Sequence, residues 1–347
     1  MTTAQTDYLN IGFMLVSLAA ALILPFELFL FSYAILGPLH YITEISWLNQ
    51  RDFFLKRRAD AILLIVLSVL VFLQFITAAI FTAPIKNLAG HSAWFLLVEL
   101  VLASLVIIAF AMARVMTWEG QARNHYEWLF GLVLMVIILQ ILLPSPYRFF
   151  SMMLPTVIHV CIFTGMFILS GTMKNQSFSG YLCFAVYIIL LVLLFIPGLL
   201  PVVQSATAYG RMSYANSGFD EINHALISLV GKETGNNNTP LFPFAWQIQA
   251  FIAFIYTYHY LNWFSKTGLV GWHKVPFKHL MAMLILWGLI ILLYLWNYRI
   301  GFMVLFLFSM LHVILEFPLN HRVMGQIYTG FAKKLRRGDR LRGDRLR

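Results

Sequence analysis

The sequence is poor in charge and in cysteine. Only 11% of its 347 residues are charged, while 61% are hydrophobic. A soluble domain carries about 25% charged residues, so this composition excludes an ordinary soluble protein. The two cysteines, Cys161 and Cys183, lie inside apolar runs and lack CxxC spacing. This excludes a disulfide framework or a cysteine zinc site and predicts two small buried side chains.

Positive charge is missing from the start of the chain. The first ten residues, MTTAQTDYLN, contain no Lys or Arg, so they lack the basic region of a secretory signal peptide. We therefore expect the first apolar run to be a retained membrane span. The net charge of +10 resides in short loops and in the carboxyl-terminal tail. That placement is typical of membrane orientation and argues against a nucleic-acid partner.

Long apolar runs dominate the remainder of the chain. A helix needs about 20 apolar residues to cross the hydrocarbon, and runs of this length do not alternate as barrel strands do. The sequence predicts an all-α integral membrane protein, a polytopic bundle of about nine transmembrane helices in one domain over residues 1–330. The expected spans are 11–36, 59–83, 92–115, 128–144, 148–172, 180–202, 243–264, 277–297 and 300–321.

The loops between these spans predict an orientation. With nine spans, most Lys and Arg fall in one set of alternate loops, together with the basic tail over residues 331–347. This distribution predicts an amino terminus outside and a carboxyl terminus in the cytoplasm. We expect residues 37–58 to form an interfacial amphipathic stretch, residues 203–242 to cap the outer face, and the tail to be disordered and to contact anionic membrane lipids.

Histidines and carboxylates inside the spans are the candidate functional groups, because ionisable side chains at that depth are costly. His40 with Glu44 and His312 with Glu316 are spaced four residues apart, which places each pair on one helix face. Imidazole with carboxylate favours non-haem iron among the common metals. The predicted metal ligands are His40, Glu44, His159, His259, His312 and Glu316, most of them in the cytoplasmic half.

Each of these residues also has a structural alternative. A histidine at a span end can sit at the headgroup level, and one within a span can hydrogen-bond a neighbouring helix. Tyr256, Tyr258 and Tyr260 flank His259 and are candidates to line a substrate channel. Their alternative is packing within the bundle or in an aromatic belt.

The stretch Gly37-Pro38-Leu39-His40, followed by isolated His259 and His312, resembles the bacterial membrane-embedded β-carotene dioxygenases. Those are multi-span helical proteins whose histidines hold a non-haem iron. The resemblance implies cleavage of a carotenoid with dioxygen to give retinal, and a place in the bacterial cytoplasmic (inner) membrane.

The favoured function is a membrane-embedded non-haem iron oxygenase, with a carotenoid or acyl chain as its lipophilic small-molecule partner. Three alternatives remain open. One is a proton- or ion-coupled transporter, against which stands the absence of an inverted repeat. A b-type haem protein is the second, with haem b held by His159 and His312. The third is a structural protein without chemistry, so the sequence alone does not decide whether the chain is an enzyme.

Overall fold

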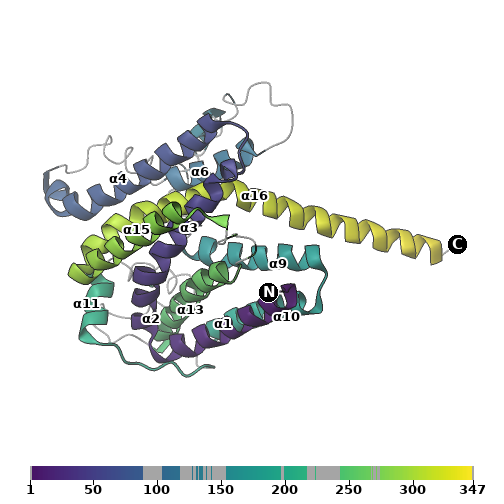
Figure 1. Cartoon of the computed structure of the whole chain (residues 1–347), viewed down its shortest axis with the longest axis horizontal. Coiled ribbons are helices and arrows are strands. Elements are labelled where there is room, and N and C mark those ends of the chain that lie inside the picture. Colours follow the sequence, from purple (N-terminus) through teal and green to yellow (C-terminus); the bar gives the residue numbers. More distant parts are fainter. Residues whose placement is uncertain are drawn as a thin grey trace.

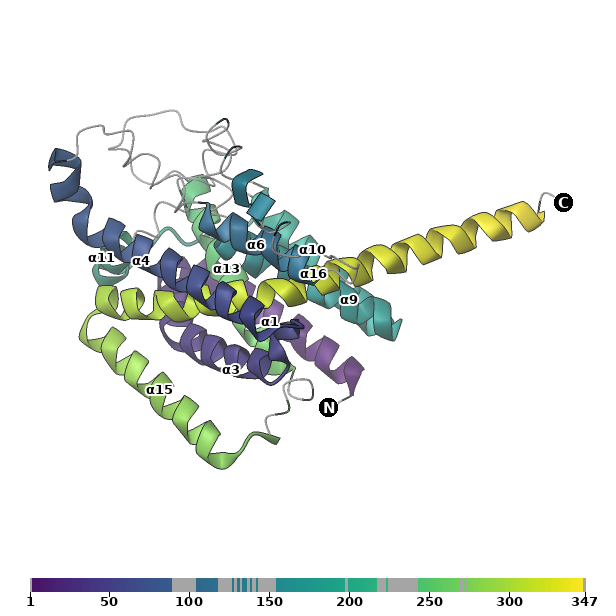
Figure 2. The same cartoon turned by 90° about the horizontal axis from the view of Figure 1, so that it is seen from above.

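The computed structural model describes residues 2–88, 104–117, 154–196, 199–216, 243–266 and 274–345, together with single residues between these ranges. Helices make up nearly all of this described part, and it contains no strand. The all-helical fold class is thereby confirmed. Figure 1 and Figure 2 show the helices gathered into a bundle, from which the last helix projects.

The amino-terminal region differs from the single span expected over 11–36. Helix α1 (Thr3–Ile23) ends at Leu24, and α2 (Pro25–Phe31) begins directly at a proline. Pro25 has no N–H to continue the hydrogen bonding of α1, so the chain breaks there. From α2 the chain runs through a π-helix, η1 (Ser32–Leu36), into α3 (Gly37–Asn49). Residues 37–49 are therefore a largely buried helix, and the prediction of an interfacial stretch is wrong for them.

The remaining elements follow in chain order. They are η2 (Asp52–Phe54), α4 (Arg58–Leu88), α6 (Leu105–Met116), the π-helix η3 (Leu154–Phe163), α9 (Thr164–Asn175), α10 (Phe178–Phe195), α11 (Ala208–Asn216), α13 (Pro243–Ser265), α15 (Phe277–Trp296) and α16 (Tyr298–Arg345).

Helix α13 lies at the centre of the bundle (Figure 1). It packs against α1, α2, α10, η3 and α3, and nearly all of its described side chains are buried. Phe251, Phe254 and Ile255 belong to the main apolar cluster. Because its neighbours cover it on all sides, α13 keeps amide, hydroxyl and imidazole groups that a lipid-facing helix could not carry cheaply.

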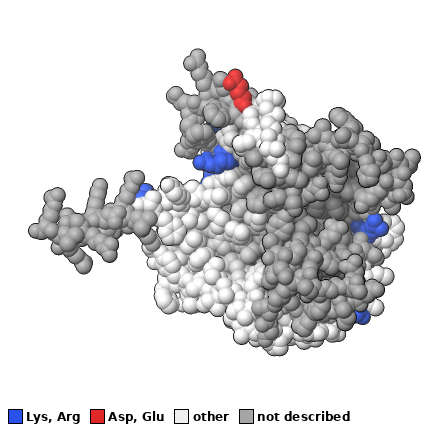
Figure 3. Space-filling view, turned by 180° about the vertical axis from the view of Figure 1, so that it is seen from behind, with Lys and Arg blue, Asp and Glu red and all other residues white. Residues whose placement is uncertain are grey.

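Six helices in the described part are long and apolar enough to cross a membrane. They are Thr3–Ile23, Pro25–Asn49, Pro155–Asn175, Phe178–Phe195, Phe277–Trp296 and Tyr298–Lys333. The prediction of about nine spans is not confirmed, and much of the expected spans 92–115 and 128–144 lies outside the described residues. Figure 3 shows a face on which the described residues carry few charges, as expected for contact with lipid.

The amino-terminal end of α1 lies beside the ends of helices that were expected on the other side. Ser179, which follows the α9–α10 turn, donates from Oγ to Asp7 Oδ2 at 2.7 Å. Asn10 donates to Ser265 Oγ, at the end of α13, at 2.9 Å. The amino terminus therefore shares a side with the loops that carry Lys174 and Lys266. Its predicted place opposite these loops is not confirmed, because the break at Leu24 gives two helices where one span was expected.

Two peripheral segments are partly described. Helix α11, within the expected cap, contacts α2, and Glu27 accepts hydrogen bonds from the backbone and hydroxyl of Thr207 just before it. That α11 caps the outer face stays a prediction. The carboxyl-terminal tail was expected to be disordered, but α16 continues through it to Arg345 (Figure 2).

Candidate metal centre

Four separate elements carry the four intramembrane histidines. His40 lies in α3, His159 in η3, His259 in α13 and His312 in α16. Two of these elements have π-helical geometry at or just before the histidine: Gly37 N–H bonds back to Ser32 O, and η3 contains His159 itself. A π-turn inserts one residue and rotates all that follows, and such turns are frequent at functional sites.

The four imidazole rings form a closed ring around one point. The centroids are 4.7 Å apart for His40–His259, 5.2 Å for His259–His159, 5.0 Å for His159–His312 and 5.3 Å for His312–His40. Neighbouring ring planes meet at 68–79°. Each imidazole therefore presents an edge, and not a face, to the centre of the cluster.

The nitrogen atoms at these edges are spaced as metal ligands are. His40 Nε2 lies 3.1 Å from His259 Nε2, and His159 Nε2 lies 3.2 Å from His312 Nε2. Ligand nitrogens about 2.1 Å from one ion lie about 3.0 Å apart at a right angle and about 3.4 Å apart at the tetrahedral angle. His40, His259 and His312 all have ligand atoms within 4.8 Å of one another, so these three histidines are able to hold one ion.

Two buried carboxylates complete the cluster. Glu44 Oε2 lies 3.1 Å from His40 Nε2, and Glu316 Oε2 lies 3.5 Å from His159 Nε2. The two carboxyl groups also interact with each other. Two carboxylates at such depth cost several kcal/mol without a counter-charge, since one charged side chain at mid-bilayer costs about 2.5–3.5 kcal/mol. One divalent cation among four neutral imidazoles would balance both charges.

Other side chains hold the histidines in place. Thr164 Oγ1 is 2.7 Å from His259 Nδ1, which leaves Nε2 of that ring directed at the cluster. The ring of Tyr41 stacks on His312 with centroids 4.2 Å apart, and its hydroxyl is 2.6 Å from that of Tyr260. Partners of this kind fix the tautomer and orientation of ligating histidines.

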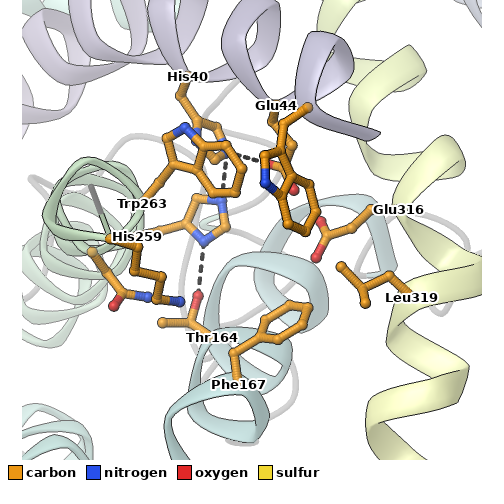
Figure 4. A pocket seen from close by; sticks show the side chains of 11 residues that line it. His40, Glu44, Thr164, Phe167, His259, Trp263, Glu316 and Leu319 are labelled. Carbon is orange, nitrogen blue, oxygen red and sulfur yellow. Dashed lines mark hydrogen bonds and ion pairs between the residues drawn. The ribbon is translucent and has the colours of Figure 1, made fainter. Parts of the chain in front are cut away.

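A small cavity opens onto one side of the cluster. Its volume is about 50 Å³, and Figure 4 shows His40, His259, Glu44 and Glu316 facing it. The remaining walls combine apolar rings with polar groups: Trp47, Thr164, Phe167, Asn262, Trp263, Lys266 and Leu319. The amine of Lys266 lies just past the end of α13. Burial lowers the pKa of Lys266, and the carboxyls of Glu44 and Glu316 partly offset that effect.

Of the six predicted ligands, His40, His259 and His312 have ligand atoms within 4.8 Å of one another. His159 adjoins His312, Glu44 adjoins His40, and Glu316 adjoins His159. That these residues bind a metal stays a prediction.

The predicted channel tyrosines separate. Tyr260 lies beside His40 and Tyr41, whereas Tyr256 packs on Phe29 and Tyr33.

Tyr258 lies elsewhere in the bundle and packs on Tyr187. None of the three channel tyrosines is among the residues that line the cavity at the cluster, so their role in a substrate path stays a prediction.

Several residues of the site were missed from the sequence. On α13, Asn262, Trp263 and Lys266 follow His259 at three, four and seven positions. On a helix these positions share one face, so the spacing alone could have indicated them. Thr164 had no comparable signal, because the π-turns of η3 change the helical period between His159 and Thr164.

Comparisons with protein-family models, with curated proteins and with solved structures find no match to this chain.

Proposed function

We propose that this chain is a membrane-embedded, metal-dependent oxygenase with a mononuclear non-haem iron site. The observation that carries the proposal is the convergence of four imidazoles and two carboxylates from four helices. Buried ionisable groups in an apolar bundle are expensive and mark function. Packing between helices does not require four imidazoles and two carboxylates in one place.

The donor set favours iron over zinc. Structural and catalytic zinc sites take four ligands in a tetrahedron, whereas this cluster offers four nitrogens and two oxygens. Nitrogen and carboxylate donors with positions left for dioxygen are typical of non-haem iron oxygenases. Bound iron would supply dioxygen activation. The histidines would hold it, and the carboxylates would neutralise its charge.

The cavity favours an open position on one side of the metal. His40, His259, Glu44 and Glu316 border it, whereas His159 and His312 are not among the residues that line it. A shift of either carboxylate would free a position facing the cavity. Its volume of about 50 Å³ suits dioxygen or water.

A lipophilic substrate fits the surroundings of this cavity. Trp47, Trp263, Phe167 and Leu319 form its apolar walls, and the outer surface of the bundle is apolar. A whole carotenoid or acyl chain exceeds the cavity, so only the reacting segment would approach the metal. The apolar walls would hold that segment.

The same geometry disfavours haem. Two axial nitrogens on one iron are separated by about 4 Å, twice a metal–nitrogen bond, and the porphyrin must extend sideways between them. His159 and His312 are closer than this, at 3.2 Å. The rings of His40 and His259 occupy the space beside them.

We infer that both chain ends lie on the cytoplasmic side. The amino terminus shares a face with the loops that hold Lys174 and Lys266. Arg51, Lys56 and Arg58 follow α3, whose end lies near the end of α13. Basic loops remain in the cytoplasm.

Metal analysis of the purified protein tests the metal site. We expect about one iron per chain and no Soret band, with iron lost from the His40→Ala and His312→Ala variants, since each removes one of the converging nitrogens. His279→Ala is the matched control, because His279 is bonded to Ser46 outside the cluster. Full iron in both cluster variants would overturn the proposal. A Soret band would indicate haem, and proton-coupled uptake by vesicles without metal would indicate transport.

A second measurement tests the substrate class. In a bacterium that makes β-carotene, expression of the chain should bleach the cells and yield retinal if the substrate is a carotenoid. The His40→Ala variant should leave the colour unchanged. Coloured cells with an iron-loaded wild-type protein would remove carotenoids and leave acyl chains as the substrate to test.

A further inference from the structure

A second cavity adjoins the one at the metal cluster. Its volume is about 100 Å³, and it shares three wall residues with the first cavity: Phe167, Asn262 and Lys266. The Lys266 amine lies 5.5 Å from the centre of the Phe167 ring. These three residues therefore form the partition between the two spaces.

The second cavity reaches the surface at the face where α1 begins and α9 ends. Asp7 and Ser177 on its rim are half-buried, and Asn175 is exposed. Most of the residues that line it are polar. The polar members, apart from the partition, are Thr6, Asp7, Asn10, Thr172, Asn175 and Ser177.

Some of these polar groups lie deeper than the ends of helices require. Asn10, Thr172 and Asn262 are each at most 5% exposed. Burying an amide or a hydroxyl has a free-energy cost unless it finds hydrogen-bonding partners. Water in the cavity would supply partners for those atoms that protein groups leave free.

Lys266 points into the bundle instead of extending toward solvent. Lysines near helix ends usually extend their amines to the membrane surface. Here the amine interacts with Glu44 and Glu316 on the side of the cluster and with Cys183 on the side of the second cavity. The charge thus stands between the two spaces.

Both cavities have room for water. A site holds one water when about 10–15 Å³ is open to it and two or more polar partners surround it. Volumes of about 50 and 100 Å³ exceed this, and the walls offer amide, hydroxyl, carboxyl and amine groups.

We propose that the two cavities form one hydrated path from the face where α1 begins to the metal cluster, with Lys266, Asn262 and Phe167 as its constriction. Water and protons enter the site by this path, while apolar molecules reach it from the bilayer. The existence of the path is independent of which metal the cluster binds. Its use in supplying protons rests on the proposed function.

The native thiol of Cys183 tests the outer half, because it lines the second cavity. In the full chain carrying Cys161→Ser and held in membranes, added silver ion should react with the thiol of Cys183. Gly171→Leu should slow the reaction by about tenfold or more. Gly171 lines the same cavity, so a leucine side chain there would displace the water through which the silver ion reaches Cys183. Gly325→Leu is the matched control. An added Cβ meets nothing within 4 Å at either glycine, and Gly325 lies on the exposed side of α16.

Asn262→Cys tests the constriction in a chain without native thiols. It should react with silver ion, and Gly171→Leu should protect it. Three results would overturn the path. The first is Cys183 in the Cys161→Ser variant reacting no faster than Cys161 in a Cys183→Ser variant, since Cys161 lines neither cavity. The others are no protection by Gly171→Leu and an inert Asn262→Cys. None of these measurements needs bound metal, so a metal-free protein would remove the proposed function and leave the path standing.

Discussion

Three of the four histidines of the cluster have a partner that limits their freedom. His40 has Glu44 in its own helix, His312 has the stacked ring of Tyr41, and His259 has the hydroxyl of Thr164. The Thr164 contact is the most specific of these, because it acts on Nδ1 and leaves Nε2 for the metal. Preorganisation by such contacts decides how tightly an ion is held.

Thr164→Val should weaken metal binding without unfolding the protein. Valine keeps the shape of threonine but cannot bond to His259 Nδ1, and loss of such a partner costs about 10- to 100-fold in metal affinity. Competition with a chelator measures the change. Thr172→Val is the matched control on the same helix, since Thr172 bonds only to the backbone of Ile168 among the contacts described. Equal affinities for the two variants would contradict this role of Thr164.

Among the elements, the two π-helices orient the site. Pro38 lacks an N–H, so it cannot take part in the regular hydrogen-bond pattern of an α-helix. The π-turns of η1, just before it, place Gly37 N–H on Ser32 O instead. The extra residue turns α3 so that His40 and Glu44 face α13 and α16.

Deleting Ile35 from η1 should abolish metal binding while leaving the helices intact. Removal of one residue restores an α-helical period and rotates the following residues by about 100°, which moves His40 away from the other imidazoles. Iron content and circular dichroism measure the two parts of this prediction. An Ile35 deletion variant that keeps its iron would show that η1 does not orient His40.

For the whole molecule, the break at Leu24 decides which ends meet. It places the start of α1 against the end of α13 and against α10 just past the α9–α10 turn. The rim of the second cavity is assembled from these same ends. The break at Leu24 therefore determines both which helix ends lie beside the amino terminus and which ends form the opening of the second cavity.

Cysteine labelling of intact cells measures this sidedness. In a chain with Cys161→Ser and Cys183→Ser, Thr3→Cys and Asn175→Cys should be protected from an impermeant reagent, because the proposed orientation places both on the inner side. Ser205→Cys, in the exposed segment before α11, should react. Labelling of both Thr3→Cys and Ser205→Cys would show that the amino terminus lies outside, as the sequence predicts.

Prediction from the sequence succeeded where a local pattern carried the information. Apolar runs indicated helices, and the cost of ionisable groups in such runs singled out His40, His159, His259 and His312. It failed at Leu24, where a single residue between two apolar helices leaves no polar loop to mark the break. Because one span was expected where the structure has two helices, the predicted side of the amino terminus is not confirmed either.

The sequence by itself determined that this chain is helical and apolar, and which of its side chains are too costly to bury without a purpose. Only the tertiary structure decided that His40, His259 and His312 lie close enough to hold one ion, that His159, Glu44 and Glu316 adjoin them, and that Thr164 and Lys266 stand beside this cluster. The physical reason is that helical period and hydropathy act within one segment. Convergence depends on the rotation and packing of helices far apart in the chain, which π-turns and prolines alter by amounts that no local pattern records.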